Sequence, residues 1–126
     1  MSRILIVDDL ESVRQGVRRI LESENDWEVC GEAASGQEAL RLTKELKPDA
    51  IVMDITMPGM SGLEATREII SAHPDSKVLI FTMHDPHTLA VPIRRSGAKG
   101  ALNKSKAPSD LTPALEAILA GHTYFQ

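Results

Sequence analysis

Five polar residues stand where short apolar segments of the chain end. Asp8 and Asp9 follow the first such segment, Asp54 ends the third, Thr82 ends the fourth and Lys104 follows the fifth. If these segments are parallel strands, their carboxyl ends meet at one edge of the sheet, which is where ligand sites of such folds lie. We therefore expect the five side chains, although distant in sequence, to line one shallow cleft.

Three carboxylates in one cleft would raise one another's pKa unless a cation neutralised them. Mg²⁺ suits this position because it prefers oxygen ligands, including carboxylates, backbone carbonyls, waters and phosphate oxygens. An aspartate beside such an ion and a lysine can attack a phosphoryl group and form an aspartyl phosphate. We expect Asp54 to be that acceptor, beside a magnesium site built on Asp8 and Asp9. The Lys104 ammonium and the Thr82 hydroxyl would then bind phosphoryl oxygens.

A simpler interpretation competes for each of these residues taken singly. Paired acids after a strand can cap the next helix, whose dipole favours negative charge, while threonine and lysine are common surface residues. The joint placement of five such residues at strand ends favours a functional site over this interpretation.

Alternating apolar segments and amphipathic segments predict the elements that position these residues. We expect strands at residues 3–7, 28–33, 50–54, 77–82 and 100–103, and helices at residues 10–22, 36–46, 62–72 and 86–96, with a last helix ending near Gly121. Ser35 with Glu38, and Ser61 with Glu64, form capping-box patterns that mark two helix starts. Strand-helix units of these lengths predict an α/β fold with a parallel sheet and helices on both faces.

Two prolines conflict with this pattern. Pro92 falls inside the expected helix 86–96, where a proline removes a hydrogen bond at a cost of about 3 kcal/mol, so that helix should be kinked or start late. Pro113 is expected near the start of the last helix, where its missing N–H is tolerated.

Composition narrows the class of protein. At 126 residues the chain has the size of one domain, which we assign to residues 1–126. Its net charge of −4 argues against this domain gripping a nucleic-acid backbone by itself. Cys30 is the only cysteine, so no internal disulfide can form. With neither a membrane-spanning apolar stretch nor a signal-like N-terminus, the expected location is cytoplasmic.

Four segments resemble, in order and spacing, the signatures of receiver domains of two-component response regulators. They are residues 4–9 (ILIVDD), residues 52–59 (VMDITMPG) with Ser61 and Gly62 after them, Phe81 with Thr82, and residues 97–104 (GAKGALNK). The resemblance covers essentially the whole chain. It implies a doubly wound, five-stranded, flavodoxin-like (βα)5 fold with strand order 2-1-3-4-5.

The resemblance also implies roles for the site residues. A sensor histidine kinase would phosphorylate Asp54, and Mg²⁺ would be bound by Asp9, Asp54 and the backbone carbonyl of Thr56, with Asp8 bound through water. Such a domain is a signalling module rather than an enzyme, with only self-phosphotransfer and slow autodephosphorylation. Within the same pocket, His84 would border the phosphoryl group together with Thr56 and tune water access.

Details of residues 35–40, 82–85 and 120–125 resemble the subfamily that carries a C-terminal LuxR-type helix-turn-helix domain. The implied output is transcription regulation, with DNA contacted only through that effector, which we expect to be absent from this chain. The alternative is a free-standing receiver that acts by protein-protein contact. Receiver domains of this kind often form a homodimer through the face made by the fourth helix, fifth strand and fifth helix.

One position departs from the family pattern. Receiver domains usually couple the residue at Thr82 to an aromatic side chain three positions before the lysine, and here that position is Ala101. We hypothesise that activation relies on Thr82 and loop movement; the alternative is that the shorter side chain changes little.

Two other function classes have a similar topology or chemistry. Phosphatases with an aspartyl nucleophile resemble a pattern with the nucleophile after the first strand and a second acid two residues later, whereas here Asp54 follows the third strand and position 56 is threonine. Flavin-binding domains need a glycine-rich or hydroxyl-rich first loop, and residues 8–11 are acidic or apolar instead. Both classes are less favoured than a receiver.

Overall fold

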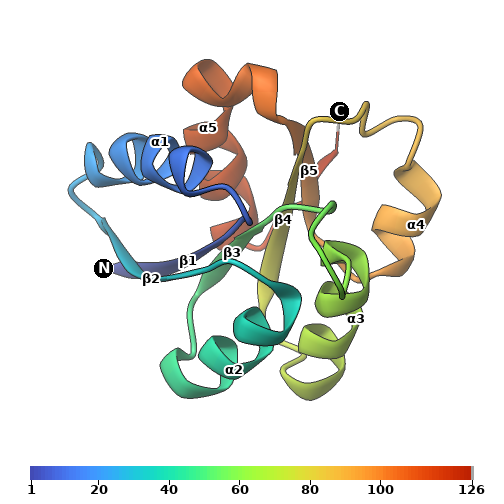
Figure 1. The fold of residues 1–126 in the computed structure, drawn as a ribbon. Coiled ribbons are helices and arrows are strands. Elements are labelled where there is room, and N and C mark those ends of the chain that lie inside the picture. The colour runs from blue at the N-terminus through green and yellow to red at the C-terminus, as the bar shows by residue number, and fades with distance from the viewer. Residues whose placement is uncertain (126) are drawn as a thin grey trace.

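Strands and helices alternate along the chain in the predicted order in the computed structural model, which describes residues 1–125 (Figure 1). The strands are β1 (Ser2–Val7), β2 (Trp27–Ala33), β3 (Ala50–Met53), β4 (Lys77–Thr82), β5 (Gly100–Asn103) and β6 (Tyr124–Phe125). The helices are α1 (Glu11–Glu22), α2 (Gly36–Leu46), α3 (Gly62–Ala72), α4 (Ala90–Arg95) and α5 (Ala107–Leu119), with a 3₁₀ turn, η1 (Lys104–Lys106), before α5. Within residues 1–125, no helix combines the length and the apolar character that crossing a membrane requires.

All strands pair in parallel, in the order β2-β1-β3-β4-β5-β6. The predicted doubly wound sheet with order 2-1-3-4-5 is confirmed. The short strand β6 extends it beyond the five predicted strands by pairing with β5. In the β1–β3 pair, Val7 lies opposite Met53, so the residues that follow the two strands emerge side by side.

Two apolar clusters hold helices on both faces of the sheet. Alternate side chains of β1 point to opposite faces, as the period of a strand requires: Ile4 and Ile6 join one cluster, while Leu5 and Val7 join the other. The first cluster packs under α1 and α5, and the second under α2, α3 and α4 (Figure 1). The central strands β1, β3 and β4 are thus buried on both faces, and a ligand site is expected at their carboxyl ends.

The two predicted serine caps are present. Ser35 Oγ accepts a hydrogen bond from the Glu38 backbone N–H at 3.1 Å, and Ser61 Oγ accepts one from Glu64 N–H at 3.2 Å. The side chain of Glu38 also accepts a backbone hydrogen bond, as in a capping box, but from the N–H of Ala34 rather than from that of Ser35. Both helices begin and end at the predicted residues, since their starts are determined by local hydrogen bonds.

The prediction for Pro92 is confirmed, whereas the prediction for Pro113 is wrong. Helix α4 begins at Ala90, so the predicted late start is confirmed and Pro92 lies in the first turn, where no N–H is required. The expected helix at residues 86–96 was therefore too long at its start. Pro113 lies inside α5, which begins at Ala107. Its expected place near a helix start was wrong, because Pro108 occupies the early position where proline is favoured.

Candidate functional site

Backbone hydrogen bonds at the carboxyl ends of three neighbouring strands bring Asp8 and Asp54 together. The Asp54 N–H donates to the carbonyl of Val7 at 2.9 Å, and the Asp8 N–H donates to the carbonyl of Ala33 at 3.0 Å. These bonds continue the β2-β1-β3 ladder by one residue beyond each strand. Asp8 and Asp54 are therefore fixed by the sheet rather than by flexible loops.

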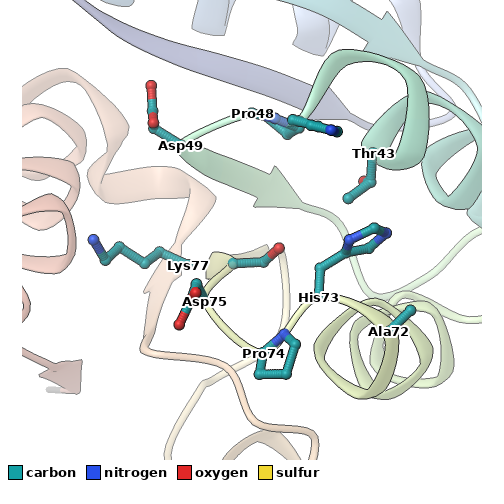
Figure 2. A pocket seen from close by; sticks show the side chains of 10 residues that line it. Thr43, Pro48, Asp49, Ala72, His73, Pro74, Asp75 and Lys77 are labelled. Carbon is teal, nitrogen blue, oxygen red and sulfur yellow. The ribbon is translucent and has the colours of Figure 1, made fainter.

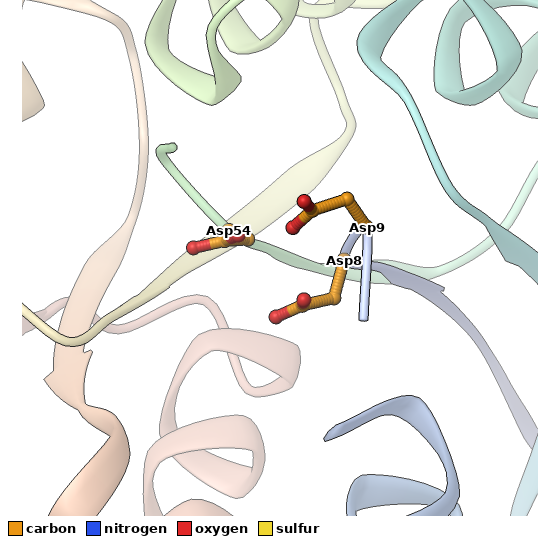
Figure 3. Close-up of side chains that lie close together, drawn as sticks. All are labelled: Asp8, Asp9 and Asp54. Carbon is orange, nitrogen blue, oxygen red and sulfur yellow. The ribbon is translucent and has the colours of Figure 1, made fainter. Parts of the chain in front are cut away.

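Asp8, Asp9 and Asp54 form one carboxylate cluster. An oxygen from each lies within 4.8 Å of the others (Figure 3). Asp8 and Asp54 are only 2% and 5% exposed, whereas Asp9 is exposed and borders solvent. Oδ1 of Asp8 accepts from the backbone N–H of Leu10 at 2.9 Å, which fixes its orientation. The predicted convergence of the three acids is confirmed.

Lys104 contributes the positive charge in this cluster. Its Nζ lies 2.6 Å from Oδ2 of Asp8 and 3.3 Å from Oδ1 of Asp54. The lysine opens the 3₁₀ turn after β5, and Asn103 caps that turn by accepting from Ser105 N–H at 2.8 Å. One ammonium against three carboxylates leaves the cluster with an excess of negative charge.

That excess changes the acidity of Asp54. Burial raises the pKa of its carboxyl above the usual aspartate value, the charges of Asp8 and Asp9 raise it further, and Lys104 offsets only part of the effect. A hard divalent cation relieves this repulsion, and clustered carboxylate oxygens are the donors that Mg²⁺ prefers. The donor set therefore fits Mg²⁺.

Two threonines lie near the carboxyl ends of β3 and β4: Thr56 follows Asp54 by two residues, and Thr82 ends β4, the neighbour of β3 on the side away from β1. Thr82 is 1% exposed, and its Oγ1 accepts from the backbone N–H of His84 at 3.0 Å. The ring of His84 reaches the other threonine, with Nε2 lying 3.3 Å from Oγ1 of Thr56. The structure thus brings His84 together with both threonines, while the role of His84 at a phosphoryl pocket stays a prediction.

The family model described as "Response regulator receiver domain" matches residues 4–116. This chain belongs to the response regulator receiver domain family. The predicted resemblance is confirmed, and the chain is a signalling module of two-component systems.

Curated relatives and a solved structure agree with this receiver assignment. The chain is 39% identical over 124 residues to response regulator GacA of Pseudomonas viridiflava and 39% identical over 124 residues to response regulator UvrY of Escherichia coli K12. Each match covers 98% of this chain but only 58% and 57% of the relatives, so the receiver spans little more than half of their length.

A crystal structure of a LuxR-family two-component response regulator from Aurantimonas sp. SI85-9A1 superposes with a TM-score of 0.94. It is 44% identical, and the match covers 98% of this chain and 89% of that one. The predicted likeness to LuxR-type regulators is therefore confirmed for the receiver domain.

Gly62 is a site residue of the receiver that the sequence analysis missed. A Cβ placed on it would lie 1.8 Å from the backbone carbonyl oxygen of Asp54. Its own N–H donates to the carbonyl of Ile55 at 2.8 Å, which closes the turn between β3 and α3. The sequence does contain a signal for this close approach. Gly62 directly follows the Ser61 cap, at a helical position whose backbone conformation does not require glycine, so a lack of space for a side chain is the remaining reason for glycine there.

A second hollow of the receiver lies at the opposite edge of the sheet, where β3 and β4 begin (Figure 2). Among its lining residues, buried Thr43 donates its Oγ1 hydroxyl to the Ala39 carbonyl, and exposed Asp49 accepts from the Arg3 N–H through Oδ2. His73 and Lys77 also line it. None of the predicted site residues lines this hollow.

Proposed function

We propose that Asp54 accepts a phosphoryl group from a sensor histidine kinase. The main support is that the Asp54 carboxylate lies within 4.8 Å of the carboxylates of Asp8 and Asp9 and 3.3 Å from Nζ of Lys104. In the transfer, the bond from phosphorus to the kinase histidine nitrogen breaks and a bond from phosphorus to an Asp54 oxygen forms. Because burial and Asp8 raise the pKa of Asp54, its charged form is disfavoured without a cation, which supports a bound cation as part of the site.

We assign the magnesium ligands to Asp9, Asp54 and the backbone carbonyl of Thr56, with Asp8 acting through water. When bound, the ion supplies neutralising charge to the carboxylates and the phosphoryl oxygens. Lys104 and Thr82 bind the transferred group in this proposal. To do so, Lys104 must turn from Asp8, and the Thr82 hydroxyl, whose oxygen accepts from the His84 N–H, must direct its own O–H to the transferred group.

The proposed output is transcription regulation through a C-terminal LuxR-type DNA-binding domain. Two findings support it: the likeness to GacA and UvrY, of which the chain spans 58% and 57%, and the net charge of −4, which disfavours direct DNA binding by the receiver. A homodimer through α4, β5 and α5 belongs to the same proposal. The assignment of residues 1–126 to the receiver alone, the free-standing alternative and the cytoplasmic location stay predictions.

A small-molecule phosphoryl donor with Mg²⁺ tests the acceptor. We expect native protein to gain the mass of one phosphoryl group and Asp54→Asn to lose at least about tenfold in labelling, because the nucleophile is gone. Asp75→Asn is the matched control, since Asp75 is an exposed aspartate at the opposite edge. Labelling of Asp54→Asn at the native rate would disprove the proposal.

A further inference from the structure

Strand β6 brings an aromatic ring beside Ala101. Phe125 lies opposite Ala101 in the β5–β6 register, and the strand is anchored by the Tyr124 N–H, which donates to the Lys99 carbonyl at 2.9 Å. Phe125 packs against the apolar cluster that contains Ala101. The guanidinium of Arg94 lies 4.0 Å from the centroid of its ring. The ring is therefore held between the edge of the sheet and α4.

A hollow adjoins this ring. It is lined by Pro86 and His87 from the segment before α4, by Ile93 and Arg94 from α4, and by Ala101 and Phe125. A neighbouring hollow shares Pro86, His87 and Ala101. Because alanine at position 101 carries only a methyl group, space remains above β5 that a large side chain would fill. Phe125 therefore has room to move without disturbing the buried core.

The wall of this hollow is connected to the Asp54 site. Residues 83–89, which we term the β4–α4 segment, contribute Pro86 and His87 to the wall. Near its start, this segment is held by the Thr82 hydroxyl, which accepts from His84 N–H at 3.0 Å, and by Asn103 Nδ2, which donates to the His84 carbonyl at 3.3 Å. A movement of the Thr82 side chain therefore alters one of the hydrogen bonds that fix the segment lining the same hollow as Phe125.

We propose that Phe125 is the positioning residue that transmits occupancy of the Asp54 site to the C-terminal strand. When the Thr82 side chain rotates toward a phosphoryl oxygen, its Oγ1 moves away from the His84 N–H. The β4–α4 segment then shifts against the hollow, and the ring of Phe125 changes its place between Ala101 and Arg94. The pairing of β6 with β5 changes with it. This inference rests on the proposed function, because it needs Thr82 to contact the group on Asp54.

Thermodynamic linkage makes the connection testable from both ends. If occupancy of the site changes the position of Phe125, then a change at Phe125 alters the affinity of the site by the same factor. If Phe125 only packed against the core, a change at this position would alter the stability of the protein but leave the affinity of the Asp54 site unchanged.

The first experiment follows the ring itself. The chain has two phenylalanines, so fluorophenylalanine labelling gives two ¹⁹F signals, which Phe125→Leu assigns. Beryllium trifluoride with Mg²⁺ stands in for the phosphoryl group. We expect the Phe125 signal to shift on saturation. Covalent labelling by a phosphoryl donor is measured separately by mass.

The two measurements separate the possible failures. Labelling at Asp54 without any shift of the Phe125 signal overturns the inference and leaves the proposed function intact. Absence of labelling overturns the proposed function, and the inference with it.

The second experiment changes the two sides of the contact. We expect Ala101→Phe, which fills the hollow, and Phe125→Ala, which removes the ring, each to change the midpoint for beryllium trifluoride by about fivefold or more. Tyr124→Phe is the matched control, because it keeps β6 and its ring, and its midpoint should stay native. Native midpoints for both Ala101→Phe and Phe125→Ala would overturn the inference, as would an equal change in Tyr124→Phe.

Discussion

The ammonium group of Lys104 forms an almost fully enclosed ion pair with Asp8, its Nζ lying 2.6 Å from Oδ2. The side chain of Lys104 is 10% exposed and that of Asp8 is 2% exposed, so water screens the pair weakly. The longer 3.3 Å contact joins the same ammonium to Asp54. Before phosphorylation, Lys104 therefore acts chiefly as the counter-ion of Asp8, and it stabilises the cluster that it is proposed to serve later.

Replacing this lysine should destabilise the receiver. In Lys104→Met the buried carboxylates lose their counter-ion, and we expect the free energy of unfolding to fall by about 3 kcal/mol without metal. Urea denaturation measures the loss, and added Mg²⁺ should recover part of it.

Lys106→Met is the control for that change, because Lys106 is an exposed lysine of the same 3₁₀ turn and should alter stability by less than about 0.5 kcal/mol. Equal stabilities of the two variants in metal-free buffer would refute the role of Lys104 as counter-ion.

Removing the charge of Asp54 should have the opposite effect. Burial and the neighbouring Asp8 raise the pKa of the Asp54 carboxyl in the folded state. The charged form therefore costs stability in full above that pKa, and the cost declines as the pH falls from the folded toward the unfolded value. At neutral pH without metal, Asp54→Asn should therefore stabilise the receiver by about 0.5–2 kcal/mol.

Thermal denaturation over a pH series that falls from neutral to acidic measures this difference. The advantage of Asp54→Asn should shrink as the pH falls and the native carboxyl takes up its proton. Added Mg²⁺ should raise the melting temperature of native protein more than that of the variant. A variant that is less stable than native protein at pH 7 would contradict the repulsion inferred for the cluster.

The elements that the sequence predicted best are those with local signals. Helices Gly36–Leu46 and Gly62–Ala72 match the prediction at both ends, because serine caps and apolar periodicity act within a few residues. Strand β6 was missed because two residues show no periodicity. It exists through its pairing with β5, a contact between segments more than twenty residues apart in the printed sequence.

The site was predictable as a set of residues but not as a set of contacts. Motif positions placed Asp8, Asp54 and Lys104 at one edge, and the cluster confirms this. The preference of Lys104 for Asp8 depends on a difference of less than an ångström between two ion pairs, which no spacing rule encodes. The contact of Gly62 with the Asp54 carbonyl is likewise a consequence of packing.

Glu32 links α1 to β2 and should govern part of the acid stability. It accepts from Arg14 Nε at 2.9 Å and from Arg18 Nε at 2.8 Å. Burial alone would raise the pKa of Glu32, but the hydrogen bonds and charges of the two arginines outweigh it and lower the pKa. A lowered folded-state pKa contributes stability that is present above the unfolded value and is lost as the pH falls through the folded one.

Glu32→Gln should therefore reduce the free energy of unfolding at pH 7, by no more than about 1 kcal/mol because the pair is partly exposed. The difference from native protein should vanish as the medium becomes acidic enough to protonate Glu32. Urea denaturation over a pH series measures it. Glu28→Gln, at an exposed position of the same strand, should track native protein, and a Glu32→Gln difference that persists unchanged in acid would rule out the ion pairs as its cause.

Gly62 should be the glycine at which a single methyl group is most harmful to the site. In Gly62→Ala the new Cβ would lie 1.8 Å from the Asp54 carbonyl oxygen, so the turn that carries Asp54 must move. We expect a loss of about 3 kcal/mol in unfolding free energy and at least about a tenfold slower labelling of Asp54, because a displaced nucleophile meets its donor in the wrong geometry.

Gly16→Ala is the opposite test of the same substitution. Gly16 lies inside α1 with nothing within 4 Å of its added Cβ, so alanine should stabilise the receiver by about 0.5–1 kcal/mol and leave labelling at the native rate. The comparison isolates the close approach from the general effect of adding a methyl group to a helix. If both variants gained stability and both were labelled as native protein is, the contact between Gly62 and Asp54 would have no part in holding the acceptor.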